Sequence, residues 1–175
     1  MSGTWVPKSP NTINFLETVT SESMDLLISA IEEMHKSIKN GASVQLLINS
    51  AGGDVKSATA FSYKIQESGI PVVTYGYSIE SAALLIYLTG TSRVAHKTRT
   101  RFFLHDVRVH IDGEQDERTA FNLAKELQRH NRLFAECVAE RTNIKAKDVL
   151  KLMQKNTWLD VEKAKALGIV HEIIG

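Results

Sequence analysis

The stretch VQLLINSAGGD, from Val44 to Asp54, carries the clearest structural pattern in the chain. Its first half is a short apolar run typical of a buried strand, and its second half contains the adjacent glycines Gly52 and Gly53. Paired glycines allow a sharp turn and a close approach of the backbone to a ligand. The stretch therefore predicts a buried strand and a tight turn into a helix, and a free backbone N–H in that turn can stabilise an oxyanion.

On both sides of this stretch, apolar runs alternate with helical periodicities. Strands are expected at 13–16, 44–49, 71–75 and 169–174, with two short ones within 93–105. Helices are expected at 21–38, 55–68, 81–89, 114–141, 145–155 and 160–167. Ser21 is the expected N-cap of the first helix and Gly41 its expected stop. The alternation predicts an α/β fold with a largely parallel sheet, and the helix at 114–141 is long enough to carry an interface.

The composition is that of an ordinary globular protein. The chain has 175 residues, and its 21 Lys and Arg nearly balance its 20 Asp and Glu. This length fits one domain, which we expect at 13–175 behind a flexible tail at 1–12. The near-neutral charge indicates neither nucleic acid nor a membrane surface as a partner. The single cysteine, Cys137, and the lack of an apolar leader or spanning segment lead us to expect a cytoplasmic protein.

Ser81 and His105 are the candidate catalytic residues. Ser81 lies in GYSIESAA (76–83), where a strand pattern gives way to an apolar helix, so the helix dipole and the next N–H can stabilise negative charge. A serine in this place can also be only an N-cap. His105 ends the apolar run RFFLH (101–105) and is expected at the rim of the sheet, with a structural role as the alternative.

Taken in order, these motifs resemble the Clp protease proteolytic subunit family, in the wider clan of signal peptide peptidases and phage head-maturation proteases. The stretch 47–55 is similar to the family's Ile-Asn-Ser-Pro-Gly-Gly turn, with Ala51 in place of proline. SAALLIYLTG (81–90) resembles its nucleophile helix, and RFFLH resembles the strand that carries its base. WLDVEKAKALGIV (158–170) is also similar to the family. The resemblance implies the fold shared with crotonases, in which repeated β-β-α units form a mostly parallel sheet with a long protruding helix.

The resemblance implies a serine endopeptidase that hydrolyses unfolded or small polypeptides without a metal or cofactor. Ser81 would be the nucleophile and His105 the general base. The backbone N–H groups of Gly53 and Ala82 would form the oxyanion hole. The substrate would lie as an extended strand along the glycine turn and along a strand that follows His105. The residues implied to bind it are Gly52, Asp54 and Asp106.

The family also implies an assembly. We expect a homo-oligomeric ring, either a heptamer or two stacked heptamers, with the helix at 114–141 between subunits. An AAA+ unfoldase or a paralogous subunit is the expected partner. The segment ahead of residue 13 is shorter than in the family, and DVRVHIDGE (106–114) replaces a glycine-rich segment. Unfoldase docking and ring stacking are therefore expected to differ.

The third member of the triad departs from the family. Asn156 stands where the family usually has aspartate. An asparagine can accept a hydrogen bond from the imidazole, but it has no charge to stabilise imidazolium. Weak or conditional activity is therefore expected, unless the nearby Asp106 or Asp160 takes over.

The approach to the nucleophile also departs, because the path from Gly76 to Ser81 is one residue longer than in the family. A gapless count would put Glu80 at the nucleophile position and make the chain inactive. Ser81 is preferred because it keeps the apolar helix in phase, and Ser78 is the remaining option.

Two other functions stay open at this point. The chain can be an inactive subunit that assembles with and regulates an active paralogue. It can also be an acyl-CoA enzyme related to crotonases, although it is short for that class, and a serine with a strand-end histidine is not the usual crotonase site.

Overall fold

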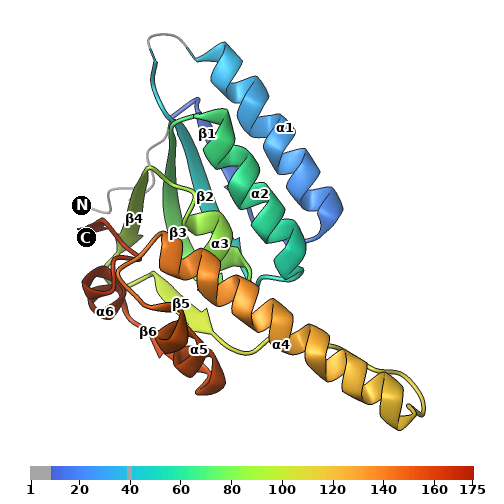
Figure 1. The fold of residues 1–175 in the computed structure, drawn as a ribbon. Helices are drawn as coiled ribbons and strands as arrows, with labels where there is room; N and C mark the ends of the chain where they lie inside the picture. The colour runs from blue at the N-terminus through green and yellow to red at the C-terminus, as the bar shows by residue number, and fades with distance from the viewer. Residues whose placement is uncertain (1–8, 39–40) are drawn as a thin grey trace.

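A seven-stranded sheet forms the centre of the computed structural model, which describes residues 9–38 and 41–175 (Figure 1). The strands are β1 (Thr12–Phe15), β2 (Val44–Ser50), β3 (Val72–Glu80), β4 (Ser92–His96), β5 (Arg101–Leu104), β6 (Thr157–Leu159) and β7 (Glu172–Ile174). The path β1-β2-β3-β4-β7 is parallel, β5 pairs in parallel with the carboxyl end of β3, and β6 pairs antiparallel with β5. The predicted mostly parallel α/β sheet is confirmed.

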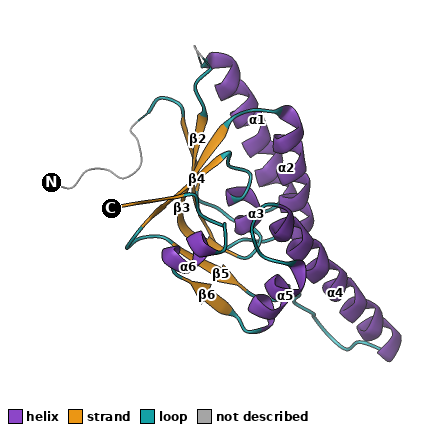
Figure 2. Cartoon of the chain, turned by 60° about the vertical axis from the view of Figure 1, so that its left-hand side comes forward, coloured by secondary structure: helices purple, strands orange, loops and turns teal. Residues whose placement is uncertain are grey.

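The helices cover the sheet mainly on one side. They are α1 (Ser21–Ser37), α2 (Val55–Ser68), α3 (Ala83–Tyr87), α4 (Glu117–Glu140), α5 (Ala146–Gln154) and α6 (Val161–Ala166). Figure 2 shows α1 to α4 together on that side. Among these described helices, none combines the length and the apolar character needed to cross a membrane.

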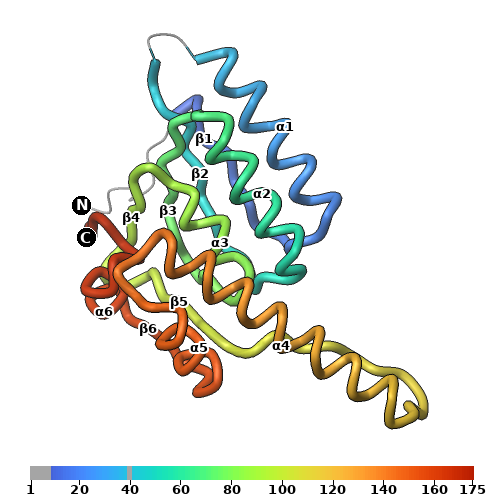
Figure 3. Tube along the Cα trace, in the orientation of Figure 1, coloured from blue at the N-terminus to red at the C-terminus, as the bar shows by residue number. Residues whose placement is uncertain are grey.

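The long helix α4 has two different halves. Its carboxyl half enters the core through Phe134, Ala135, Cys137 and Val138. Its amino half is mostly exposed and projects from the body of the protein, as the tube in Figure 3 shows. The predicted long protruding helix is thus confirmed.

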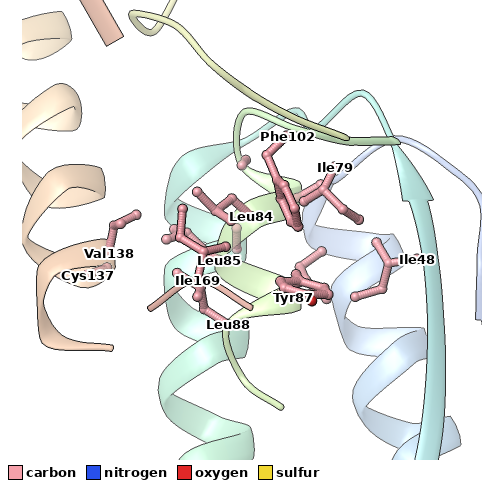
Figure 4. Close-up of a cluster of buried hydrophobic side chains, with 14 of the residues drawn as sticks. Ile48, Ile79, Leu84, Leu85, Tyr87, Leu88, Phe102, Cys137, Val138 and Ile169 are labelled. Atoms are coloured by element: carbon pink, nitrogen blue, oxygen red, sulfur yellow. The ribbon is translucent and has the colours of Figure 1, made fainter. Parts of the chain in front are cut away.

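The short helix α3 lies at the centre of the core (Figure 4). All five of its residues are buried. Tyr87 meets the ring of Phe102 edge-on, with centroids 5.3 Å apart, and Ile79 and Val138 belong to the same buried cluster. A helix this short is not stable in isolation, so its packing stabilises it.

Several predicted boundaries differ from the structure. Thr20, not Ser21, is the N-cap of α1, because Thr20 and Ser23 form a reciprocal capping box with hydrogen bonds of 3.0 and 2.9 Å. The same helix ends at Ser37, before the predicted stop at Gly41. The predicted tail at 1–12 lies largely outside the described residues, and β1 already begins at Thr12.

The largest correction concerns the segment ahead of α3. The sequence predicts a strand at 71–75 and a helix at 81–89. The strand instead continues to Glu80, because its carboxyl end gains β5 as a second partner, and the helix begins only at Ala83. Strand β6 was not predicted, since its three residues are fixed by pairing with β5 rather than by a local pattern. The last strand covers only Glu172–Ile174.

Candidate active site

Ser81 lies in the turn that joins β3 to α3. Its backbone φ of 53° is in the left-handed region, which costs a non-glycine residue on the order of 1–3 kcal/mol. The Ser81 N–H donates to the carbonyl oxygen of Phe103 at 2.8 Å, so the turn is fixed to β5. A serine in a strained turn between a strand and a helix carries the nucleophile in some serine hydrolases.

The glycine turn after β2 packs directly against the Ser81 turn. A Cβ atom at Gly52 would lie 2.6 Å from the carbonyl oxygen of Glu80 and 2.8 Å from the Cβ of Ser81. A Cβ atom at Gly53, whose φ is 148°, would lie 2.2 Å from the carbonyl oxygen of Val19. Neither position has room for a side chain, so the predicted tight glycine turn is confirmed, and its close approach is to the backbone around Ser81.

The two N–H groups predicted to form an oxyanion hole belong to these two neighbouring turns. The bridge between Val19 and Gly53 uses the carbonyl of Gly52 and the N–H of Asp54, with hydrogen bonds of 2.8 and 2.9 Å, and leaves the Gly53 N–H aside. In the described part of the chain, neither the Gly53 N–H nor the Ala82 N–H donates to a protein acceptor. They differ in access, because Gly53 is exposed and Ala82 is fully buried.

The side chain of Asp54, a predicted substrate-binding residue, caps α2. Its carboxylate accepts a hydrogen bond from the Ser57 N–H at 2.7 Å. Burial acts to raise the pKa of Asp54, but the hydrogen bonds from Ser57 outweigh it and the pKa is lowered. Asp54 therefore stays ionised and fixes the start of the helix that follows the glycine turn.

A β-bulge interrupts the pairing of β2 with β3 shortly before Ser81. Ile48 pairs with Gly76, whereas Ser50 pairs with Ile79, so two steps along β2 match three steps along β3. Bulges re-aim side chains and are frequent beside active sites. Within the bulged segment, the hydroxyl group of Ser78 donates to Glu80 Oε1 at 2.8 Å. An open hollow of about 430 Å³ lies here, lined in part by Ser50, Ser78 and Glu80.

His105 follows β5 directly, and its ring is half-buried. Its Nδ1 lies 2.6 Å from the carbonyl oxygen of Asp106. A carbonyl oxygen can only accept, so Nδ1 carries the proton and Nε2 is left as a base. Asp106 thus contacts His105 through its backbone. The predicted strand after His105 is absent, because residues 105–116 form no strand and the Val107 N–H donates to Asn131 Oδ1 at 2.8 Å.

Asn156 lies immediately before β6, with a left-handed φ of 49°. The β5–β6 ladder pairs Leu104 with Thr157, so continuing it by one residue puts Asn156 opposite His105. Asn156 Oδ1 nevertheless accepts from Arg108 Nη2 at 3.3 Å. Asp160, another candidate for the third member of the triad, instead caps α6. Its carboxylate accepts a hydrogen bond from the Lys163 backbone N–H at 2.8 Å.

The two candidate catalytic side chains are brought to neighbouring strand ends without a direct bond. Ser81 is fixed to Phe103, two residues before His105. Over residues 9–38 and 41–175, no hydrogen bond joins Ser81 to His105 or His105 to Asn156. The same ranges contain no group of three or more His, Cys, Asp or Glu side chains arranged to hold a metal ion.

Two aromatic residues beside His105 were missed by the sequence reasoning. The rings of Phe103 and His105 have centroids 5.2 Å apart, and Phe103 stacks on Trp158 at 4.5 Å. The alternation in RFFLH could have placed Phe103 on the face of His105. Trp158 stands in a motif that the sequence analysis quotes, but its place beside Phe103 depends on β6, which was not predicted.

Comparisons with known proteins agree with this architecture. A family model described as Clp protease matches residues 9–175. The ATP-dependent Clp protease proteolytic subunit 3 of Rhizobium meliloti (strain 1021) is 31% identical over 135 residues, which cover 75% of this chain and 67% of that protein. Proteins named proteolytic subunit 2 are 25% identical in Corynebacterium diphtheriae and 30% in Gluconobacter oxydans, each over 75% of this chain. The chain spans 66% and 60% of their lengths.

Proposed function

The chain belongs to the Clp protease family, and from this premise we propose that it is a serine-type endopeptidase subunit with Ser81 as nucleophile and His105 as general base. The observation that carries the proposal is the contact between the left-handed Ser81 turn and the glycine turn, which leaves the N–H groups of Gly53 and Ala82 without protein acceptors. The bulge in β3 supports Ser81 over Glu80, since it absorbs the extra residue before the turn.

The proposed reaction begins with proton transfer from Ser81 Oγ to His105 Nε2, while Oγ attacks the carbonyl carbon of the peptide. The resulting oxyanion accepts hydrogen bonds from the N–H groups of Gly53 and Ala82. His105 then gives the proton to the leaving amine, and water hydrolyses the acyl-enzyme by the same steps. Catalytic hydrogen bonds are often long in free enzymes and tighten with substrate, so the missing Ser81–His105 bond is compatible with this role.

In this account the third position has a weaker role than in a Ser-His-Asp site. Asn156 is neutral and is engaged by Arg108, so imidazolium receives no charge stabilisation from it. We therefore expect slow hydrolysis of unfolded polypeptides or small peptides. We also carry over to this chain a cytoplasmic ring of like subunits, a heptamer or stacked heptamers, served by an AAA+ unfoldase. Here Gly52 and Asp54 would shape the substrate path at the glycine turn.

Two observations also favour a second function, that of a non-catalytic subunit paired with an active paralogue. They are the missing Ser81–His105 hydrogen bond and the neutral Asn156. His105 reaches neither Ser81 nor a carboxylate in the described residues. Such a subunit would form rings normally and hydrolyse nothing alone.

A peptidase assay on an unstructured fluorogenic peptide separates these functions. The wild type is expected to turn over slowly, Ser81→Ala to lose this activity, and Ser78→Ala, the matched hydroxyl deletion three residues away, to keep it. Peptidase activity that survives in Ser81→Ala would contradict the assignment of Ser81 as the nucleophile. A folded, oligomeric wild type without activity, alone or with an unfoldase, would favour the non-catalytic subunit.

A further inference from the structure

The orientation of His105 needs an explanation, because no carboxylate in residues 9–38 and 41–175 accepts from its ring. In Ser-His-Asp sites the carboxylate holds the imidazole in its working tautomer and orientation. Here the carbonyl of Asp106 fixes the tautomer. This bond contacts one edge of the ring and leaves its face to be held by other contacts.

A stack of side chains on the outer face of β5 and β6 supplies the second constraint. Arg101 and Phe103 share a face of β5, and His105, directly after the strand, contacts Phe103. Trp158 pairs with Phe103 across the β5–β6 ladder. The Phe103 ring lies 4.5 Å from Trp158 at 21° and 5.2 Å from His105 at 33°. The guanidinium of Arg101 lies 4.5 Å from the centre of the Trp158 ring. We call these four residues the aromatic ladder.

At the Arg101 end, the aromatic ladder is hydrogen-bonded to the strand that leads to Ser81. Arg101 Nε donates to the hydroxyl oxygen of Ser78 at 3.4 Å, and that hydroxyl donates to Glu80 Oε1 at 2.8 Å. Glu80 is the residue before Ser81. The ladder therefore connects the strand that ends at the nucleophile with the ring of the base.

The core does not account for this arrangement. Phe102, Leu104 and Leu159 form the buried face of the same two strands. Trp158 is 45% exposed, and Arg101 is exposed. Trp158 contacts Arg101 and Phe103, and Phe103 in turn contacts His105.

We propose that Trp158 is a positioning residue for His105, acting through Phe103 and held in place by Arg101, and that it supplies part of the orientation that a carboxylate supplies in Ser-His-Asp sites. Trp158 touches neither substrate nor a reacting atom in this role. The proposal deepens the proposed function and rests on it for the effect on catalysis, but the position of the ring can be measured without any activity.

The first test observes the His105 ring by NMR in protein with labelled histidine, with its signals assigned through His105→Gln. Trp158→Ala is expected to shift and broaden these signals and to weaken the contacts between the Phe103 and His105 rings. Trp158→Phe, which keeps a stacking ring, is expected to restore them. Phe121→Ala is the matched control, since Phe121 is an exposed aromatic with its own cation, Lys125, at 4.3 Å, and it is expected to leave the signals unchanged.

Unchanged His105 signals and ring contacts in Trp158→Ala would overturn the proposal. If Trp158→Ala does not fold, Arg101→Met removes the cation and keeps the length of the side chain. Arg101→Met is expected to broaden the same His105 signals. Unchanged His105 signals in this variant would equally overturn the proposal.

The second test uses hydrolysis. In Trp158→Ala, kcat is expected to fall by roughly three- to tenfold, the range set by the loss of one aromatic pair, with KM nearly unchanged and with recovery in Trp158→Phe. A rise in KM at unchanged kcat would instead make Trp158 a substrate contact and contradict positioning. A wild type with an ordered His105 ring and no hydrolysis would refute the proposed function and leave the positioning result standing.

Discussion

The nucleophile half and the base half of the candidate site are built in opposite ways. Ser81 is held by backbone contacts alone, between β5 and a glycine turn with no room for a Cβ atom. His105 and Asn156 lie at an accessible edge, where one carbonyl and a row of stacked side chains set the geometry. The nucleophile half is therefore constrained by backbone sterics, whereas the base half is constrained mainly by contacts between partly exposed side chains.

The largest effect is expected where the backbone contact is closest. Gly53→Ala would place a methyl group 2.2 Å from the carbonyl oxygen of Val19, and we expect it to lower the free energy of unfolding by about 3 kcal/mol and to abolish activity. Urea unfolding checks the first effect. Gly69→Ala is the matched control, because Gly69 has a left-handed φ of 66° with nothing within 4 Å of the added Cβ, and it should cost only about 1 kcal/mol. Equal losses in the two variants would show that the glycine turn is not sterically fixed.

A single negative charge in the base half is expected to raise kcat. In Asn156→Asp a carboxylate stands opposite His105 and can stabilise imidazolium, so kcat should rise by roughly tenfold or more. The stability should change little, since Asn156 is exposed. Arg108 competes for this side chain, so the double variant with Arg108→Gln should gain further. Steady-state kinetics with thermal melts measures both, and an unchanged or lower kcat in the double variant would contradict the assignment of this position.

A smaller effect separates strain from chemistry at Ser81. Both Ser81→Ala and Ser81→Gly remove the hydroxyl group and should be inactive. Glycine adopts the left-handed conformation without penalty, so Ser81→Gly should be more stable than Ser81→Ala by about 1 kcal/mol. Chemical denaturation of the pair tests this, and an equal or lower stability of the glycine variant would mean that the turn is not strained.

The smallest expected effect is on the pH dependence of stability, and it comes from His171, which lies outside the candidate site. Burial, and then the charge of the neighbouring Arg93, lower the pKa of His171 in the folded protein. The unfolded chain therefore binds this proton first, and stability should fall as the pH drops below the ordinary histidine pKa of about 6.5. His171→Gln should flatten this part of the stability curve and leave the pH profile of kcat in place. A matching change in the kcat profile would mean that the pH dependence of activity reflects stability rather than His105.

The features that the sequence predicts well are the local ones. The helix from Val55 to Ser68 was predicted at its observed bounds, and in the structure Asp54 caps its start and Gly69 its end. The glycine turn was predicted because Gly52 and Gly53 are adjacent in the sequence. The features that were missed depend on pairing between distant segments: β3 extends to Glu80 because β5 lies beside it, and β6 exists because it pairs with β5.

The same distinction applies to the site. Ser81, His105 and Asn156 were identified as candidates by motif order, but the left-handed φ of Ser81 depends on packing against Gly52. The stack in which Trp158 supports Phe103, and Phe103 contacts His105, depends on the unpredicted strand β6. The candidate residues could therefore be named from the sequence, whereas the contacts around them could not.

The measurement that tests the central claim most directly is the site of fluorophosphonate labelling, mapped by mass spectrometry of the digested protein. If Ser81 is the nucleophile and His105 its base, the adduct forms on Ser81, disappears in Ser81→Ala and forms far more slowly in His105→Gln. An adduct on Ser78, or a folded and assembled wild type that carries no adduct on Ser81, would contradict the account.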